Sequence, residues 1–207
     1  SSSSLGKDKK LEMTTREGYL RSFRKYGVDP RALKWQSQKA AEQRYREIVS
    51  LVNFKGRSIL DVGCGFGGII PFIASRTKKF SYTGIDKIAE FVKEARNLYP
   101  KQTFITGDYF AKPLKGKFDV VIANGSLNSN LKNNIGFRRE AIRAMFEHAK
   151  EAVVFNLAGG YPQPKTAKDS NIWFADALEI LRFCLDLTPR VTFINHPGRR
   201  EFSLRLL

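Results

Sequence analysis

The sequence predicts an α/β fold built on a mostly parallel sheet, and three observations carry that prediction. From Ser58 onward, short apolar runs alternate with amphipathic segments, which is the pattern of parallel strands joined by crossover helices. A glycine-rich stretch directly follows the first apolar run. Near the end of the chain, two apolar runs are joined by a short Pro-Gly turn, which places the last strand antiparallel to its neighbour.

Two helical segments are expected before the sheet, at residues 13–26 and 37–52. Pro30 interrupts the periodicity between them and places a loop ahead of Trp35. The apolar residues of the second segment recur on one helical face: Ala41, Tyr45, Ile48, Val49 and Val52. The two segments therefore form an expected N-terminal helical cap.

Strands and helices should then alternate along the chain. The expected strands are residues 58–62, 81–85, 103–105, 118–123, 152–157, 190–195 and 201–207. The expected helices are residues 68–76, 88–98, 137–149 and 172–187. A loop rich in glycine, proline and polar residues separates the fifth strand from the last of these helices.

The domain organisation follows from these elements and from the length of 207 residues, which suits one domain with a substantial core. Residues 1–12 are expected to be a tag remnant or a disordered tail. Residues 13–207 should form a single domain, divided into the cap (13–52) and the sheet-containing core (53–207).

Composition excludes several classes of protein. No run of eighteen apolar residues exists, and the stretch SSSSLGKDKK has no apolar signal-peptide region, so we expect no membrane span and no secretory signal. Cys64 and Cys184 are too few for a disulfide framework or a zinc site, so we expect no metal and a cytoplasmic location.

The net charge of +16, from 36 basic and 20 acidic residues, would attract polyanions or anionic substrates. The basic residues are dispersed along the chain, and the longest runs are pairs such as Lys9-Lys10 and Arg199-Arg200. Dispersed charge of this kind favours a solvated surface over a nucleic-acid stripe, although it leaves nucleic acid open as a partner.

The glycine-rich stretch is ILDVGCGFGG, residues 59–68. Gly63 and Gly65 can adopt positive φ and let a ligand approach the backbone, while the following helix would present free N–H groups. The stretch satisfies both G-x-G-x-x-G and G-x-G-x-G, so the glycines alone leave the identity of the cofactor open. A tight turn with nothing bound is the alternative.

Polar residues follow three further strands. Asp86 ends the second strand, where it could accept hydrogen bonds from ribose hydroxyls or cap the next helix. Asp108 follows the third strand and could accept an adenine amino proton, with Tyr109 or Phe110 covering the ring, although Gly-Asp is also an ordinary turn. Asn124 follows the fourth strand, at the edge of the sheet where ligands bind in open α/β folds.

Together these stretches resemble the class I S-adenosylmethionine-dependent methyltransferase family, which is Rossmann-like. ILDVGCGFG is similar to its first motif, GID to its acidic second motif, TGDYF to the acid after strand three, and FDVVIANG to its fourth motif. The resemblance covers roughly Ser58 to the C-terminus. It implies a seven-stranded sheet of order 3-2-1-4-5-7-6 with strand seven antiparallel and helices on both faces.

The resemblance also implies the cofactor, because the family places an acid two residues before the first glycine and a nicotinamide enzyme has no obligatory acid there. Asp61 and the glycines would hold the methionine part of S-adenosylmethionine, Asp86 the ribose and Asp108 the adenine. The whole implied cofactor set is Asp61, Gly63, Cys64, Gly65, Asp86, Lys87, Asp108, Tyr109, Asn124 and Gly125. Lys87 departs from the apolar residue common in the family at this position.

On the acceptor side, methyl transfer is an in-line displacement that depends mainly on proximity and orientation. A base is needed only if the acceptor must lose a proton, and His196 is the one candidate catalytic residue, with a hairpin-turn histidine as the alternative. His148 is expected to interact with the dipole of its own helix. Candidate acceptor contacts lie on three segments flanking the cofactor: Trp35, Ser126, Asn128 and Tyr161.

The function expected from the sequence is transfer of a methyl group to a small molecule by a monomer or homodimer. Arg138 and Arg139, at the start of a predicted helix, leave an anionic acceptor open. ANGSLN stands where many base methylases have N/D-P-P-Y/F, which lowers the case for base methylation. The alternatives are an RNA- or protein-modifying methyltransferase, a nicotinamide oxidoreductase, and a cofactor-binding protein without catalysis.

Overall fold

The computed structural model describes residues 16–207, so the predicted tail and the first residues of the predicted helix 13–26 lie outside the described residues. The described residues divide into two compact units between Glu47 and Ile48, and this division falls inside helix α2 (Gln38–Leu51). The cap boundary expected at residue 52 stays a prediction.

In the first unit, residues 16–26 form a helix, and a single 3-10 turn, η1 (Pro30–Leu33), precedes α2. The sequence predicted only a loop here. The turn forms because the Asp29 carboxylate accepts the Arg31 N–H at 2.9 Å and Pro30 supplies a helical φ at the first position. The guanidinium of Arg44 lies 4.9 Å from the centroid of the Trp35 ring, so Trp35 has a cation–π partner inside its own unit.

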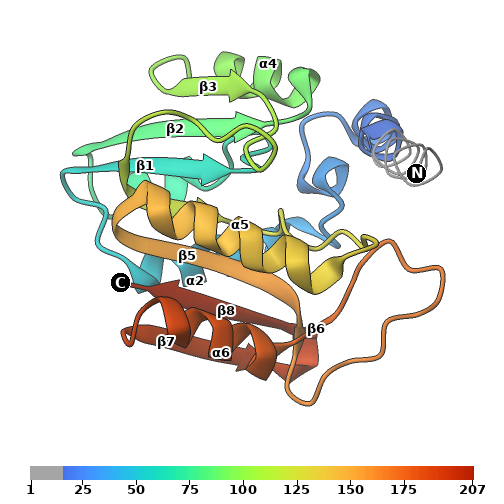
Figure 1. The fold of residues 1–207 in the computed structure, drawn as a ribbon. Helices are drawn as coiled ribbons and strands as arrows, with labels where there is room; N and C mark the ends of the chain where they lie inside the picture. Colours follow the sequence, from blue (N-terminus) through green and yellow to red (C-terminus); the bar gives the residue numbers. More distant parts are fainter. Residues whose placement is uncertain (1–15) are drawn as a thin grey trace. The chain divides into compact units, whose positions relative to one another are not determined.

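The second unit is built on one sheet (Figure 1). Its long strands are β1 (Arg57–Val62), β2 (Phe80–Asp86), β3 (Thr103–Thr106), β4 (Phe118–Ala123), β5 (Ala149–Gly160), β7 (Val191–His196) and β8 (Glu201–Leu206). Their order is β3-β2-β1-β4-β5-β8-β7, and β8 runs antiparallel to both β5 and β7. The predicted order and the antiparallel last strand are therefore confirmed. Sequence reasoning missed β6 (Ala175–Asp176), a two-residue strand that pairs with β5.

The helices between the strands are α3 (Ile70–Ala74), α4 (Ala89–Leu98), α5 (Asn134–His148) and α6 (Ala177–Leu187), and a 3-10 turn η2 (Pro197–Arg199) joins β7 to β8. α6 begins five residues later than expected. Residues 172–176 are extended instead, and the Asp176 carboxylate caps α6 by accepting the Leu178 N–H at 3.0 Å. α5 begins earlier than expected because the Asn133 side chain accepts the Gly136 N–H.

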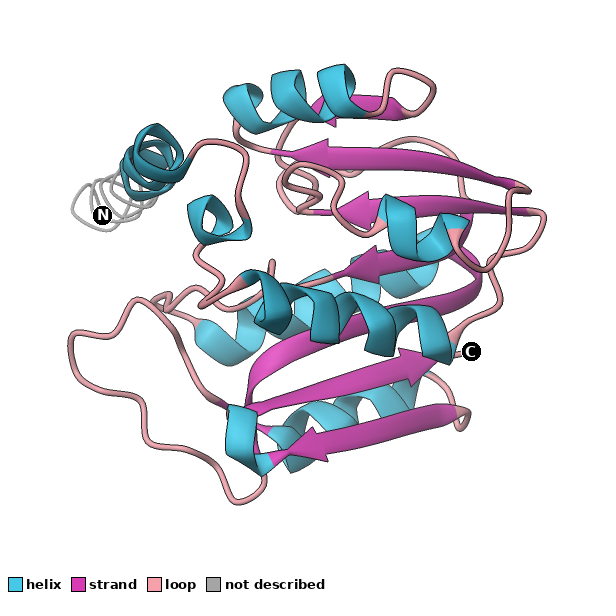
Figure 2. Ribbon diagram, turned by 180° about the vertical axis from the view of Figure 1, so that it is seen from behind, coloured by secondary structure: helices cyan, strands magenta, loops and turns pink. Residues whose placement is uncertain are grey.

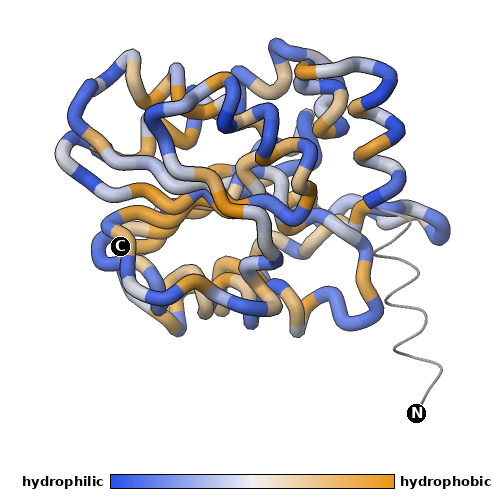
Figure 3. Tube along the Cα trace, turned by 90° about the horizontal axis from the view of Figure 1, so that it is seen from above, coloured by the Kyte–Doolittle hydropathy of each residue, from blue (hydrophilic) through white to orange (hydrophobic). Residues whose placement is uncertain are grey.

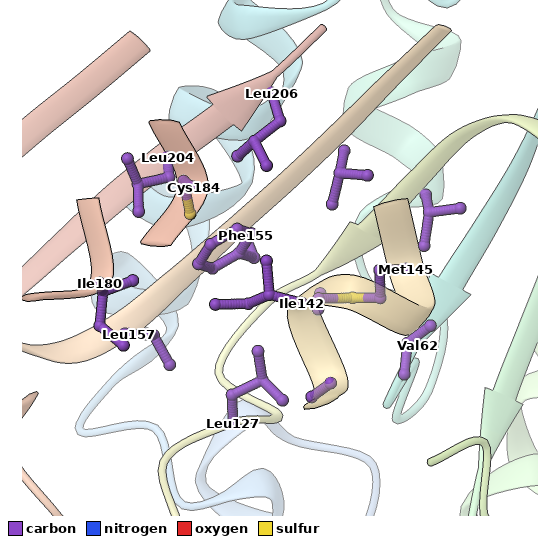
Figure 4. Close-up of a cluster of buried hydrophobic side chains, with 14 of the residues drawn as sticks. Val62, Leu127, Ile142, Met145, Phe155, Leu157, Ile180, Cys184, Leu204 and Leu206 are labelled. Atoms are coloured by element: carbon purple, nitrogen blue, oxygen red, sulfur yellow. The ribbon is translucent and has the colours of Figure 1, made fainter. Parts of the chain in front are cut away.

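α5 and α6 cover one face of the sheet, and α3 lies on the opposite face, as the view from behind shows (Figures 1 and 2). Apolar residues concentrate on the strands, whereas the connecting loops are hydrophilic (Figure 3). Side chains from α5 and α6 pack with those of β1, β4, β5 and β8 into one buried cluster (Figure 4): Val62, Ile142, Met145, Phe155, Leu157, Ile180, Cys184, Leu204 and Leu206. Burying each large aliphatic or aromatic side chain contributes about 1.5–3 kcal/mol, so this cluster stabilises the packing of α5 and α6 on the sheet.

Candidate functional site

The glycine turn follows β1 at the carboxyl edge of the sheet. Gly63 and Gly65 have φ values of +74° and +54°, as expected, and the Gly63 N–H donates to the Ile85 carbonyl at 2.8 Å. A Cβ placed on Gly63 would lie 2.5 Å from the Cβ of Ser126. Glycine is therefore required at position 63 both for the backbone conformation and for the close approach of the segment after β4.

Asp86 ties the end of β2 to this turn. Its two carboxylate oxygens accept the Gly65 N–H and the Ile88 N–H, each at 2.9 Å. Burial raises the pKa of Asp86, and the two backbone hydrogen bonds oppose that rise. Because α4 begins at Ala89 with Ile88 as its N-cap, the predicted capping of this helix by Asp86 is wrong. A carboxylate has about four lone-pair sites, so two remain for ligand hydroxyls.

Asp61 is the most deeply buried acid of the site. Asp61 is only 4% exposed. Its carboxylate accepts a hydrogen bond from the Tyr82 hydroxyl at 2.6 Å. Burial raises the pKa of Asp61 to about 7, with a further rise from the charge of Asp86 and an opposing effect of the Tyr82 hydrogen bond. This carboxyl group therefore changes charge near neutral pH, and a cationic ligand beside it would favour the ionised form.

The titration of Asp61 makes folding stability depend on pH. In the unfolded chain a carboxyl group of this type ionises near pH ~4, whereas in the folded chain it ionises near 7. Between these values the folded state retains a proton that the unfolded state has released, so the free energy of unfolding falls as pH rises from about 4 to about 7 and this decline ends above that range.

We expect Asp61→Asn to remove this decline, because asparagine carries no ionisable proton. Three pKa units correspond to about 4 kcal/mol at most. The measurement is urea unfolding of both proteins between pH 4 and 8, with the difference between them plotted against pH. Parallel curves for the two proteins would show that Asp61 does not titrate in this range.

Asp108 and Lys87 are brought together beside the turn. The Lys87 ammonium nitrogen lies 3.4 Å from a carboxylate oxygen of Asp108, and both side chains are substantially exposed. The other carboxylate oxygen of Asp108 accepts the Ala111 N–H at 3.3 Å. An exposed pair of this kind contributes about 1 kcal/mol or less, so separating Lys87 from Asp108 would cost little. Lys87, the residue that departs from the family pattern, thus lies against one of the implied ligand acids.

The structure corrects the expectation for Tyr109. Its side chain is buried at 2% exposure, and its hydroxyl lies 2.6 Å from Nδ1 of His148. The prediction that this ring covers an adenine is therefore wrong, because the chain after Asp108 turns the ring toward the C-terminal end of α5. His148, expected to interact with the helix dipole, has the Tyr109 hydroxyl as its hydrogen-bond partner. Phe110 packs on Phe137 at 5.6 Å between ring centroids.

We expect Tyr109→Phe to lower the free energy of unfolding by about 1 kcal/mol, since it removes one hydrogen bond inside the protein. Affinity for S-adenosylhomocysteine, the product form of the implied cofactor, should stay within about twofold of wild type, because the hydroxyl that is removed is directed at His148 of α5. Urea unfolding and calorimetric titration measure the two effects. Tyr82→Phe is the matched comparison, since it removes a hydroxyl bonded to Asp61. A large loss of affinity in Tyr109→Phe alone would contradict the buried placement.

Cys64 also faces inward. The residue is 6% exposed, and a Cβ on Gly84 would lie 2.8 Å from its sulfur. Burial raises the pKa of the thiol. Its thiol fills the space above a glycine of β2, so Cys64 can offer a ligand only its backbone.

The segment after β4 is held by a residue that sequence reasoning missed. Asn156 of β5 donates its amide to the Asn124 side-chain oxygen and accepts the Gly125 N–H, both at 2.6 Å. The hydroxyl of Ser126 is buried and has no hydrogen-bond partner among residues 16–207. A polar residue inside the apolar run AVVFNLA was the only available signal for Asn156.

Residues 128–130, which follow β4, and residues 171–173, which precede β6, are joined to each other. The Asn128 carbonyl accepts the Trp173 N–H at 3.0 Å, the Asn130 N–H donates to the Asn171 carbonyl at 2.9 Å, and Ser129 and Ile172 form an antiparallel bridge. The Asn128 side chain accepts the Ala158 N–H at 2.8 Å. Residues 128–130 and 171–173 therefore form one connected wall.

Arg138 lies behind this wall and is completely buried. Its guanidinium donates to the Asn134 side chain at 3.1 Å and stacks on the Trp173 ring at 4.8 Å. Burial lowers the pKa of Arg138 to about 10. Arg138 is therefore inaccessible to an anionic acceptor, contrary to one interpretation of the sequence, whereas Arg139 lies close to Glu179 at 3.5 Å.

Tyr161 and His196 lie farther from the glycine turn. Tyr161 is 57% exposed, and the Asn195 side chain binds both its N–H and its carbonyl, at 3.1 and 2.7 Å. His196 ends β7, the edge strand, opposite Glu201 in register. β7 lies four strand positions from β1, which corresponds to ~19 Å at ~4.8 Å per strand. A catalytic role for His196 stays a prediction, and so do the acceptor contacts of Trp35 and Tyr161.

Within residues 16–207, no helix is long and apolar enough to cross a membrane, and no group of three or more histidine, cysteine or acidic residues is arranged to hold a metal ion.

The fold and the glycine turn together define a Rossmann-like α/β protein with a nucleotide-type site at the carboxyl edge of its sheet. Residues 59–152 match the family described as a methyltransferase domain. A ribosomal RNA small subunit methyltransferase C from Klebsiella pneumoniae is 30% identical over 117 residues, which cover 53% of this chain and 34% of that protein. The chain thus spans about a third of the length of this relative.

Solved structures share the fold. Magnesium protoporphyrin IX methyltransferase from Synechocystis, with bound S-adenosylhomocysteine, aligns with a TM-score of 0.61 at 20% identity over 81% of both chains. The N-methyltransferase NodS from Bradyrhizobium japonicum aligns with a TM-score of 0.63 at 17% identity over 92% of this chain and 96% of its own. The class I methyltransferase resemblance expected from the four sequence motifs is confirmed.

Proposed function

We propose that the chain is an S-adenosylmethionine-dependent methyltransferase that transfers a methyl group to a small molecule by in-line displacement. The observation that carries this proposal is the glycine turn, where Asp86 binds the Gly65 N–H beside the buried Asp61. Two carboxyl groups and a glycine backbone that a ligand can approach therefore lie close together. A cofactor with an ammonium group and ribose hydroxyls requires this combination.

The chain's own residues fit this cofactor in four places. Asp61, whose pKa is about 7, would hold the ammonium group, and Asp86 would accept the ribose hydroxyls. Asp108 would accept the adenine amino proton. The unpartnered hydroxyl of Ser126 and the Asn124 side chain would line the side nearest the sulfonium. When bound, the cofactor supplies an activated methyl group, and the protein contributes orientation and exclusion of water.

The preference for a small acceptor rests on the compact second unit and on the fold neighbours, whose names refer to a porphyrin methyltransferase and an N-methyltransferase. The connected wall formed by residues 128–130 and 171–173 supports an acceptor site of fixed shape. A cytoplasmic location and the monomeric or dimeric state stay predictions from the sequence.

RNA is the second candidate acceptor. The relative named as a ribosomal RNA methyltransferase and the net charge of +16 favour it, whereas the dispersion of the charge does not. Binding of RNA across a salt series separates the two, because phosphate contacts make affinity fall steeply with salt. Sub-micromolar RNA affinity at physiological salt with a steep slope would replace the small-molecule proposal.

The test of the proposed activity is calorimetric titration with S-adenosylmethionine, followed by a screen with labelled cofactor against metabolite and RNA pools. We expect saturable binding and transfer of label to a metabolite. The absence of detectable binding at millimolar cofactor would contradict the proposal, as would a wild-type protein that binds cofactor but labels nothing in either pool.

A further inference from the structure

Asn156 is one of the few buried polar side chains of the sheet. It is 2% exposed and lies on β5 between the buried apolar residues Phe155 and Leu157. A side-chain amide in such surroundings is costly unless both its donor and its acceptor are satisfied. Both are satisfied by a single neighbouring segment, the one that leaves β4 toward the candidate cofactor site.

The two hydrogen bonds of Asn156 fix that segment in different ways. Its oxygen accepts the Gly125 N–H at 2.6 Å, which holds the backbone. Its NH2 group donates to the Asn124 oxygen at 2.6 Å, which leaves the Asn124 NH2 group as the part of that amide available elsewhere. Asn156 therefore sets both the path of the chain and the direction of the Asn124 amide.

The next residue makes this position critical. Ser126 packs so closely against Gly63 that a Cβ added there would lie 2.5 Å away. A small displacement of the segment toward the glycine turn would cause a clash, and a displacement away from it would open the site. The distance between the glycine turn and the segment 124–126 therefore depends on the hydrogen bonds that hold this segment to β5.

We propose that Asn156 is a positioning residue of the cofactor site, acting through Asn124 and Gly125 to hold the segment 124–126 against the glycine turn. The inference rests on the proposed function. It assigns to β5 a part in cofactor binding that none of the four sequence motifs contains.

The test measures S-adenosylhomocysteine affinity by calorimetry in three variants. Asn156→Ala removes both hydrogen bonds, and we expect affinity to fall about 10–100-fold. Asn156→Asp keeps the acceptor for Gly125, and its protonated form restores the donor to Asn124. Its affinity relative to wild type at the same pH should therefore be close to normal at pH 5 and fall as pH rises to 8.

The control is Thr188→Ala. Thr188 is also buried, at 8% exposure, and bridges the Leu207 carbonyl and the Arg190 N–H, but it lies at the opposite edge of the sheet. We expect it to lower the melting temperature without changing S-adenosylhomocysteine affinity. In an Asn124→Ala background, Asn156→Ala should cost less affinity than it does alone, because one of its two partners is already absent.

Wild-type affinity in Asn156→Ala would overturn the inference, as would an equal loss in Thr188→Ala or full additivity with Asn124→Ala. If Asn156→Ala does not fold, the pH-dependent affinity of Asn156→Asp decides, and the absence of that dependence overturns the inference. A wild-type protein that fails to bind S-adenosylhomocysteine would instead contradict the proposed function, which keeps the two outcomes distinct.

Discussion

Gly63→Ala is expected to abolish detectable binding of S-adenosylhomocysteine and to lower the free energy of unfolding by about 2 kcal/mol or more. The φ of +74° costs a residue with a Cβ about 1–2 kcal/mol. The added methyl group would also lie 2.5 Å from the Ser126 Cβ, so the segment after β4 must move away from the glycine turn. Calorimetric titration and urea unfolding measure the two effects.

Gly56→Ala provides a closely matched control. Gly56 has the same φ of +74°, and a Cβ placed there would meet nothing within 4 Å. The free energy of unfolding of this variant should therefore fall only by the cost of placing a Cβ at positive φ, about 1–2 kcal/mol. The variant should bind S-adenosylhomocysteine as wild type does. If the two variants behave alike, the packing of Ser126 against Gly63 is not what shapes the site.

Asp86→Ala is expected to reduce S-adenosylmethionine affinity by about 100-fold or more. The carboxylate would accept two ribose hydroxyls, and each hydrogen bond to a charged group contributes about 1.5–3 kcal/mol. The substitution also releases the Gly65 N–H, which Asp86 binds at 2.9 Å, so the glycine turn loses one of its constraints. Calorimetric titration of the folded variant measures the loss.

Asp119→Ala is the control for Asp86→Ala, because it also removes a carboxylate that accepts a backbone N–H but does so away from the candidate cofactor site. Asp119 accepts the Ser58 N–H at 2.8 Å at the opposite edge of the sheet, and this bond lowers its pKa. We expect this variant to lose stability and to retain cofactor affinity. Wild-type affinity in Asp86→Ala would show that the ribose does not bind to this carboxylate.

The sheet could be predicted because its signals are local. Five parallel strands are short apolar runs that end at turn residues, and their order follows from the family that the motifs resemble. The start of α6 could not be predicted in this way. Residues such as Ile172 and Trp173 are compatible with a helix, and only pairing with a distant segment makes them extended.

Site residues could be predicted where the backbone conformation requires a particular residue type. They could not be predicted where packing with distant residues decides which way a side chain points. The positive φ of Gly63 and the position of Asp86 follow from sequence pattern. The inward rotation of Tyr109 depends on His148, 39 residues away in the chain, and no local pattern reports it. Asn156 is similar, because its importance appears only when β5 lies beside β4.

The pairing of residues 128–130 with 171–173 restricts how this protein can diversify. A change of length in either segment would break hydrogen bonds to the other and disturb the stacking of Trp173 on the buried Arg138. We therefore expect homologues with different acceptors to differ by side-chain replacements at exposed positions of this wall, with its backbone length kept constant.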